Sequence, residues 1–503
     1  MSTLDARKAA SSEAADGVER FDVKPVHADE HRSLYQAREP IYPKRVHGPF
    51  RKAKWLFLVL ALGAYYLAPW IRWDRGPNDA SQAILVDFGG RKLYFFGLEI
   101  WPQEFYLVTG VLILAGLVLF LVTSLFGRVW CGYACPQTVW TDLFIAVERW
   151  VEGDRNKRIA LARRPWTDPD KLRKKALKHS IWLLIAFATG GAWIIYFNDA
   201  PTLARDFFIG QADLSAYMFA GILTFTTYSL AGLMREQVCV YMCPWPRIQA
   251  ALTDEHALNV LYRYDRGEPR GAHKKGDTWE DRGDCIDCNA CVVACPMGID
   301  IREGSQLACI QCALCIDACD EIMEKVDRPK GLIAYDTPDN VERRLRGEKP
   351  QFVLFRARTI IYAVASLIVV AALVVGLAQR TDARFNVLRD RNPPFVALSD
   401  GSVRNGYTLK LLNKTAERRE FLITAEGPEG LDLRGVGLRT AEDALLASVD
   451  ADTVLAARVF LTLPSTALIE GETAVRFVVR DTASEIEDSA DSVFLGPRNG
   501  GSP

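Results

Sequence analysis

Residues 285–319 read CIDCNACVVACPMGIDIREGSQLACIQCALCIDAC, and this stretch decides the organisation of the chain. It holds two successive runs of four cysteines, each with the spacing C-x2-C-x2-C-x3-C. This doubled spacing holds two [4Fe–4S] clusters in bacterial proteins, and the fourth cysteine of each run crosses to the other cluster. The spacing therefore predicts one cluster on Cys285, Cys288, Cys291 and Cys319, and a second on Cys309, Cys312, Cys315 and Cys295.

Zinc knuckles and disulfides are the alternatives for eight closely spaced cysteines. Zinc sites favour separated CxxC pairs, and the doubled run does not have that form. The first run ends in Cys295-Pro296, whereas the second ends in Cys319-Asp320 and so lacks the proline after its fourth cysteine. This difference removes no ligand. The stretch therefore predicts an inserted, bacterial-type ferredoxin segment with two clusters.

The composition restricts the classes of protein that the chain can represent. Its 503 residues suffice for several domains, and its net charge of -1 gives no electrostatic support for a nucleic-acid partner. The 12 cysteines are gathered, because eight lie in the cluster stretch and the others form two CxxxC pairs. Such thiols indicate metal and redox chemistry that faces a reducing compartment.

Five apolar stretches have roughly the ~20-residue length that a helix needs to span a bilayer. They are Trp55–Ile71, Phe105–Phe126, Ile181–Phe197, Ala216–Met234 and Ile360–Ala378. Buried helices of a soluble protein are the alternative, but the second and fifth stretches contain no charged residue. The sequence therefore predicts an α-helical transmembrane bundle with five spans in a lipid bilayer.

The basic residues predict an orientation in the membrane. The loop of residues 128–178 is rich in lysine and arginine, whereas the loop between the third and fourth stretches holds only Arg205. By the positive-inside rule, the N-terminus and the 128–178 loop face the cytoplasm. Five spans then place all 12 cysteines on the cytoplasmic side and the chain after residue 380 on the opposite side, which is the periplasm for an inner-membrane protein of a bacterium.

The chain is thus expected to be a multi-domain membrane protein. Residues 1–50 are polar, show no signal peptide, and are predicted to form a disordered cytoplasmic tail. The predicted order that follows is a four-span membrane domain (51–256), a ferredoxin-like domain (257–350), a fifth transmembrane helix (356–379) and a periplasmic domain (380–503).

The periplasmic domain shows short runs of alternating apolar residues between turn residues. Examples are Tyr407, Leu409 and Leu411 in one run and Val475, Phe477 and Val479 in another. Period-two alternation at this spacing predicts an immunoglobulin-like β-sandwich. The domain has no cysteine and no visible catalytic constellation, so we expect a docking or structural role.

Two CxxxCP motifs follow the second and fourth predicted spans. Residues 130–136 read WCGYACP and residues 238–244 read VCVYMCP, so the membrane domain is predicted to contain an internal repeat. Each proline favours a new helix just after the second cysteine, and a thiol at a helix N-terminus is expected to have a lowered pKa.

Soft thiolates favour Cu(I), zinc or iron–sulfur centres. If the halves of the repeat meet, Cys131, Cys135, Cys239 and Cys243 can form a copper site, which makes them the candidate catalytic residues. The alternative is that these four are small buried side chains in a helix repeat. Met234 and Met242 are candidate thioether ligands, with ordinary packing as the alternative.

The order of these parts resembles the FixG/RdxA/CcoG type of cytochrome c oxidase accessory protein. The resemblance rests on YPKRVHG (42–48), FFGLEIWPQ (95–103), both CxxxCP motifs, both cysteine runs, and NGYTLK (405–410). It implies a membrane iron–sulfur protein that reduces Cu(II) to Cu(I) for the biogenesis of cbb-type oxidases. It also implies a copper exporter or chaperone and oxidase assembly factors as partners.

Three hypotheses follow for the function. In the first, electrons from an unidentified cytoplasmic donor pass through both clusters to Cu(II) near the CxxxCP cysteines. In the second, the protein is a quinol-linked conduit like the polyferredoxin membrane subunits of nitrate-reduction systems, which lack the fifth span and outer domain. In the third, it is a non-catalytic scaffold for oxidase assembly.

Overall fold

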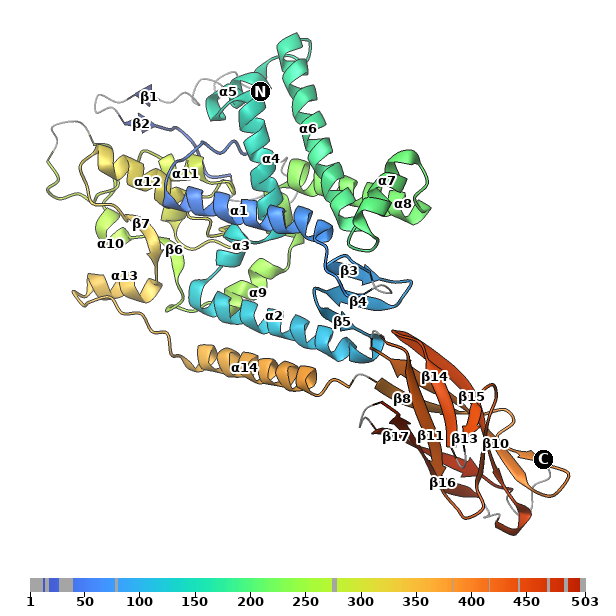
Figure 1. Ribbon diagram of the computed structural model, residues 1–503. Coiled ribbons are helices and arrows are strands. Elements are labelled where there is room, and N and C mark those ends of the chain that lie inside the picture. Colours follow the sequence, from blue (N-terminus) through green and yellow to red (C-terminus); the bar gives the residue numbers. More distant parts are fainter. Residues whose placement is uncertain are drawn as a thin grey trace. The chain divides into compact units, whose positions relative to one another are not determined.

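The computed structural model divides the chain into two compact units (Figure 1). One comprises the chain up to residue 73 together with residues 82–374, and the other comprises residues 74–81 and 375 onward. The structure describes residues 12–13, 18–26, 39–76, 80–273, 278–381, 383–415, 417–441, 444–467, 471–483 and 487–497.

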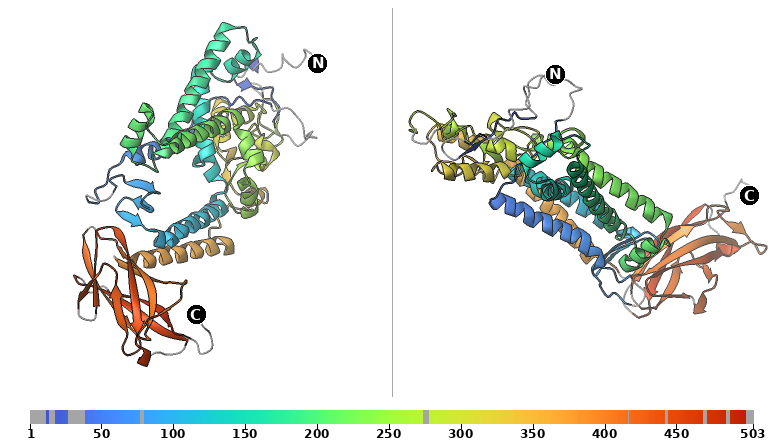
Figure 2. Two further views of the ribbon diagram at one scale, coloured as in Figure 1. Left: turned by 90° about the vertical axis from the view of Figure 1, so that its right-hand side faces the viewer. Right: turned by 90° about the horizontal axis from the view of Figure 1, so that it is seen from above.

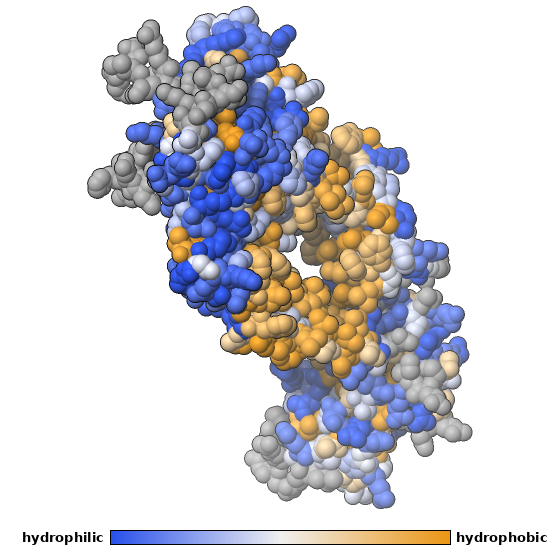
Figure 3. Space-filling model, turned by 90° about the vertical axis from the view of Figure 1, so that its left-hand side faces the viewer, coloured by the Kyte–Doolittle hydropathy of each residue, from blue (hydrophilic) through white to orange (hydrophobic). Residues whose placement is uncertain are grey.

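The five predicted spans are confirmed as helices long and apolar enough to cross a bilayer. They lie in Pro49–Trp70, Pro102–Phe126, Pro169–Ile194, Leu214–Met234 and Ala357–Ala378. The corresponding α-helices are α1 (Pro49–Leu67), α2 (Phe105–Phe126), α6 (Pro169–Ile194), α8 (Leu214–Thr227) and α14 (Ala357–Ala378). Many of their large apolar side chains are exposed, and the face of the molecule in Figure 3 shows an apolar band between hydrophilic regions, as contact with lipid requires.

The third span begins well before its apolar stretch. Asp168 caps α6, because its carboxylate accepts hydrogen bonds from the backbone N–H groups of Asp170 (2.9 Å) and Lys171 (3.4 Å). Such a side chain satisfies N–H groups that have no partner within the helix. Helix α6 therefore begins at the cap and includes basic residues that precede the apolar stretch predicted from the sequence.

Helices α6 and α8 lie side by side (Figures 1 and 2). A Cβ at Gly190 of α6 would lie 2.5 Å from the carbonyl oxygen of Ala220 and 2.9 Å from Oγ1 of Thr224, both on α8. Small residues allow such close approach between membrane helices. A Cβ added at Gly191, next in sequence, would meet no other described residue within 4 Å outside its own helix backbone.

Shorter elements connect the spans. The remaining helices are α3 (Val129–Tyr133), α4 (Pro136–Glu152), α5 (Arg155–Arg163), α7 (Ala200–Ile209), α9 (Trp245–Leu252), α10 (Tyr264–Gly267), α11 (Ala290–Ala294), α12 (Leu314–Lys325) and α13 (Pro338–Leu345). The strands of this unit are β1 (Ser12–Glu13), β2 (Glu19–Arg20), β3 (Ile84–Asp87), β4 (Lys92–Phe95), β5 (Leu98–Ile100), β6 (Asn259–Tyr262) and β7 (Ile333–Asp336).

The cysteine-rich segment folds between β6 and β7, which pair antiparallel, and its core includes residues of α11 and α12. This segment and the membrane helices belong to one compact unit. One reason is that Asp317 of α12 accepts hydrogen bonds from the backbone N–H groups of Phe50 (3.3 Å) and Arg51 (2.7 Å) in the first turn of α1. A carboxylate there also interacts favourably with the helix dipole.

The expectation of a disordered tail over residues 1–50 is wrong for the part that the structure describes. Residues 18–26 lie on the ferredoxin segment, where the backbone N–H of Phe21 donates to the carbonyl oxygen of Cys288 at 3.1 Å. Val18, Phe21 and Val46 are buried in that segment's core. These few apolar side chains in a polar stretch are enough to order it, because they pack on the ferredoxin segment of the same chain. Residues 1–11, 14–17 and 27–38 lie outside the described residues.

The second unit is a sandwich of two antiparallel sheets, as predicted. One sheet has the order β12-β15-β10-β8 with β9 beside β10, and the other has the order β13-β14-β11-β16-β17. The strands are β8 (Ala383–Arg389), β9 (Val396–Ala397), β10 (Val403–Asn413), β11 (Arg419–Glu426), β12 (Asp432–Gly435), β13 (Arg439–Ala441), β14 (Ala444–Val449), β15 (Thr453–Leu463), β16 (Glu472–Asp481) and β17 (Glu487–Leu495).

The alternating residues of the sandwich form its core, including Tyr407, Leu409 and Phe477. The NGYTLK motif also links the two sheets. The Asn405 side chain donates to the carbonyl oxygen of Leu495 (2.9 Å) and accepts from its N–H (3.0 Å), and the Tyr407 hydroxyl donates to the carbonyl oxygen of Val493 (3.0 Å). These bonds explain polar residues at buried positions of β10.

Candidate functional site

The two cysteine runs fold into loops with the same backbone conformation. Positive φ angles occur at Asp287 and Asn289 in the first loop and at the equivalent Gln311 and Ala313 in the second. Successive residues of this kind turn backbone N–H groups toward a common centre. In the second loop the N–H of Gln311 donates to Sγ of Cys309 at 3.4 Å. Both loops are therefore shaped to surround sulfur-bound groups.

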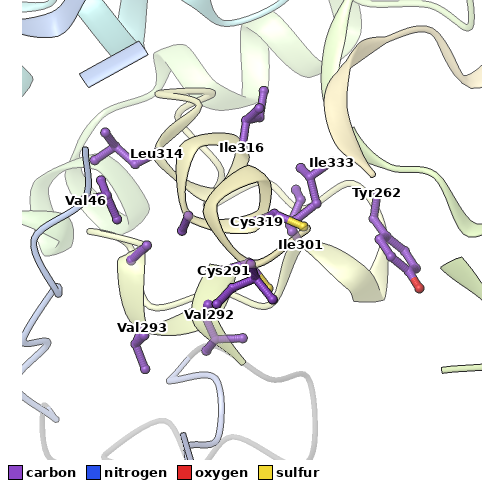
Figure 4. Packing of buried hydrophobic residues seen from close by; sticks show 14 of the residues in the cluster. Val46, Tyr262, Cys291, Val292, Val293, Ile301, Leu314, Ile316, Cys319 and Ile333 are labelled. Carbon is purple, nitrogen blue, oxygen red and sulfur yellow. The ribbon is translucent and has the colours of Figure 1, made fainter. Parts of the chain in front are cut away.

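Two cavities gather the cysteines into two sets of four. The first cavity is lined by Cys285, Cys288, Cys291 and Cys319 together with apolar side chains. The second is lined by Cys295, Cys309, Cys312 and Cys315, with Cys291 at its edge. Figure 4 shows Cys291 and Cys319 inside the core near Ile301 and Ile333. Four thiols around an apolar cavity fit a [4Fe–4S] cluster, and the sets match the crosswise grouping that the spacing predicts.

The two CxxxCP motifs begin with the same unusual backbone turn. Gly127, four residues before Cys131, has φ 60° and ψ -128°. Arg235, four residues before Cys239, has φ 46° and ψ -113°. A non-glycine residue in this region is strained. The shared turn supports the predicted internal repeat.

The motifs diverge after this turn. In the first, Cys131 lies in α3 and Cys135 is the N-cap residue of α4, so the predicted new helix begins at Pro136. In the second, Val238–Met242 form a π-helical turn, and Pro244 separates Cys243 from α9. Neither pair therefore shares a face of one continuous α-helix.

The four CxxxCP thiols are close enough to influence one another's ionisation. Burial raises the pKa of both Cys131 and Cys239 to about 12, and the neighbouring Cys135 acts in the same direction. At these two thiols, the first cysteine of each motif, burial outweighs nearby positive charge. The lowering predicted for a thiol at a helix N-terminus concerns the second cysteine of each motif. Among the residues that the structure describes, no three Cys, His, Asp or Glu side chains lie close enough together to hold a single metal ion.

The first CxxxCP motif packs directly on the loop of the second cavity. A Cβ at Gly132 would lie 2.8 Å from the carbonyl oxygen of Gln311 and 2.9 Å from that of Ile310. The Arg128 side chain donates to the carbonyl oxygens of Cys309 (3.2 Å) and of Pro246 (2.8 Å). Arg128 thus ties the cysteine loop to the chain that follows the second motif.

A small cavity of about 30 Å³ lies beside Cys239. Its walls include the charged residues Lys54, Asp142, Arg235 and Glu236. Met297 and Ile310 line both this cavity and the second cysteine cavity. Among the residues that the structure describes, these two are the side chains common to both linings, and we call them the shared wall.

Glu148 of α4 is the centre of a buried ion-pair cluster. Its carboxylate lies 2.6 Å from the Arg235 guanidinium and 3.3 Å from Nζ of Lys178, and it also pairs with Arg158. Burial alone would raise the pKa of Glu148, but these cations outweigh it and lower the pKa to about 2. The cluster holds Arg235 in its strained turn next to the second motif.

Sequence reasoning missed several residues of this region. Gln249 of α9 is fully buried and accepts a hydrogen bond from the Cys131 thiol at 3.2 Å. Neither Gln249 nor Glu148 belongs to a recognisable motif. The sequence signal for these residues is that they are charged or amide side chains within helices next to the CxxxCP motifs. That signal does not show which distant residues they contact.

Family profiles match three parts of the chain. A profile described as 4Fe-4S dicluster domain matches residues 234–338, and one described as 4Fe-4S binding domain matches residues 107–158. Residues 107–158 contain two cysteines, Cys131 and Cys135. A profile described as IG-like fold at the C-terminal of FixG matches residues 373–497.

Three curated proteins are similar over most of the chain. The nitrogen fixation protein FixG of Rhizobium meliloti is 48% identical over 95% of this chain and 97% of its own length. Protein RdxB of Cereibacter sphaeroides is 52% identical over 93% of this chain and 98% of its own. Protein RdxA of the same organism is 54% identical over 79% of this chain and 84% of its own.

Proposed function

The chain belongs to the FixG family of membrane iron–sulfur proteins, and from that premise we propose that it reduces Cu(II) to Cu(I) for the assembly of cbb-type cytochrome c oxidase. The proposed cluster ligands are the cysteines of the two cavities. The two [4Fe–4S] clusters supply one-electron transfer when bound, which matches the one-electron reduction of copper.

The contact between Gly132 and the second cysteine loop carries this proposal. It brings the first CxxxCP motif against the carbonyl groups of Ile310 and Gln311, inside the loop that holds Cys309 and Cys312. Electron transfer slows steeply with distance, so an electron acceptor at the motif is well placed to be reduced from the second cavity. The first cavity, which lacks this contact, is then the entry point for electrons from a cytoplasmic donor.

The CxxxCP thiols suit the product of this reaction. Thiolate sulfur is a soft ligand that stabilises Cu(I) relative to Cu(II), so binding at Cys131, Cys135, Cys239 or Cys243 favours reduction. Among the described residues, no three of these thiols lie close enough together to hold one ion, so binding by three of them would require them to move together. Each thiol that binds releases its proton to water.

We place the reaction on the cytoplasmic side of the inner membrane. The basic loop of residues 128–178 supports this orientation by the positive-inside rule, and the sandwich then lies in the periplasm. Cu(I) would be passed to a copper exporter or chaperone, and the sandwich would dock oxidase assembly factors.

The test replaces all four CxxxCP cysteines by serine in the full-length protein. Iron content and the absorbance of the clusters should stay as in the wild type, whereas reduction of Cu(II) should be lost. Unchanged copper reduction would refute the role of the thiols. Loss of iron in the variant would show that the thiols hold iron, the alternative raised by the 4Fe-4S profile over residues 107–158.

Two other functions predict different results. A quinol-linked conduit predicts that added quinol reduces the clusters in membranes, and that Cu(II) leaves them reduced. If the protein is a non-catalytic scaffold, oxidase assembly should still proceed when all four thiols are replaced. It should fail only when the protein itself is absent.

A further inference from the structure

The cavity beside Cys239 combines a thiol, a thioether and a carboxylate. Met297 of the ferredoxin segment is 4% exposed and contributes to the wall between this cavity and the second cysteine cavity. Met297 follows Cys295-Pro296, so its position is fixed by a cysteine of the second cavity. A thioether is a soft ligand for Cu(I).

Asp142 of α4 supplies an oxygen at the same cavity. The side chain is buried, and its Oδ1 accepts from the Arg51 guanidinium at 2.8 Å. Its Oδ2 accepts no hydrogen bond from the residues that the structure describes, and its ion-pair contact is with Nζ of Lys54 at 3.9 Å. Lys54 supplies charge to this oxygen but no hydrogen bond, so the oxygen keeps acceptor capacity that a water molecule or a metal ion can use.

We propose that this cavity is the copper pocket, in which Met297 and Cys239 hold Cu(I) through sulfur and Asp142 first receives Cu(II) through oxygen. The inference rests on the proposed function and names the ligands of its substrate. Oxygen ligands suit the harder Cu(II) and sulfur ligands the softer Cu(I), so the metal moves toward Met297 and Cys239 as it is reduced. The volume of about 30 Å³ accommodates one ion or one water molecule.

The step balances as a one-electron transfer. Cu(II) would gain one electron through the one-electron chemistry that a [4Fe–4S] cluster held by Cys295, Cys309, Cys312 and Cys315 would supply, and Cys239 would lose its thiol proton to water as its sulfur binds. The reductant that restores the cluster is a cytoplasmic one-electron carrier.

Ordinary packing is the competing explanation for a buried methionine. Met323 of α12 is its matched example, because it is 1% exposed and lines the first cysteine cavity without reaching the pocket at Cys239. If Met297 only fills space, replacing either methionine by leucine should have the same small effect, since the exchange conserves volume. If Met297 binds copper, only its replacement should change the metal site.

The test uses full-length protein labelled with selenomethionine and loaded with Cu(I). X-ray absorption at the copper edge should show a selenium neighbour in the unsubstituted protein and in Met323→Leu, but not in Met297→Leu. Competition with a Cu(I) chelator should show that Met297→Leu weakens Cu(I) binding by about tenfold or more, whereas Met323→Leu does not. Iron content should be the same in all three proteins.

The outcomes separate this inference from the proposed function. Copper reduction and Cu(I) binding with only sulfur neighbours would overturn the role of Met297 and leave the reductase standing. A selenium neighbour that persists in Met297→Leu would assign the thioether to another methionine, such as Met234 or Met242, and would also overturn it. Protein that neither reduces nor binds copper would overturn both.

Discussion

Replacing Gly132 by alanine tests the contact between the CxxxCP motif and the second cysteine loop. The added Cβ would lie 2.8 Å from the carbonyl oxygen of Gln311, whereas ordinary contacts begin near 3.4 Å, so about 0.6 Å of displacement is required. Both facing atoms belong to the backbone and cannot rotate away. Overpacking of this kind costs about 1–3 kcal/mol. This cost corresponds to about a 5- to 150-fold shift of the equilibrium away from the conformation in which the loop contacts the motif.

The assay compares the two clusters within one protein. The displaced loop carries Cys309 and Cys312, so the paramagnetic resonance signal of the second cluster should change in Gly132→Ala while that of the first stays. Copper reduction should slow by at least severalfold. Gly116→Ala in α2 is the control, because a Cβ there meets nothing within 4 Å.

Three results would refute this reasoning. Gly132→Ala with wild-type signals and wild-type copper reduction would mean that the motif and the loop do not touch. Equal changes in both clusters would mean that the substitution unfolds the segment as a whole. A control that behaves like Gly132→Ala would mean that any added methyl group in this region has the same effect.

Further predictions concern stability and the role of the sandwich. The pKa of Glu148 is lowered to about 2 from an ordinary value of 4.5, so its stabilising effect is complete above pH 4.5 and is lost as the pH falls toward 2. Thermal unfolding followed from pH 6 to pH 3 should show this loss, and Glu148→Gln should be less stable at neutral pH and vary less with pH. Gly190→Ala should lower the unfolding temperature in detergent, whereas Gly191→Ala should not, because only the first Cβ meets α8. Protein without residues 380–503 should still reduce copper in detergent, and loss of reduction would assign the sandwich a part in the reaction.

The features that the sequence predicts well are those repeated along the chain. Apolar length predicts the five spans, and period-two alternation predicts the strands around Tyr407 and Phe477. Cysteine spacing predicts which thiols line each cavity, because chain length between ligands restricts which thiols can meet.

The features that the sequence does not predict depend on contacts between distant residues. Arg235 occupies a turn where the first repeat has Gly127, and it is held there by contacts with residues such as Glu148 and Trp182, which lie far away in the sequence. The pKa values of Cys131 and Cys239 depend on burial, and both side chains pack against the core of the ferredoxin segment, which no local pattern reports. The order of residues 18–26 likewise depends on a surface formed more than 250 residues later, as the contact between Phe21 and Cys288 shows.

The most direct test of the account is a single anaerobic titration. The purified protein is reduced, separated from the reductant, and mixed with Cu(II) while the cluster absorbance and the colour of a Cu(I) chelator are followed together. A copper reductase should lose one cluster electron for each Cu(I) formed, with the two signals changing at the same rate. Clusters that stay reduced in the presence of Cu(II) would contradict the central claim.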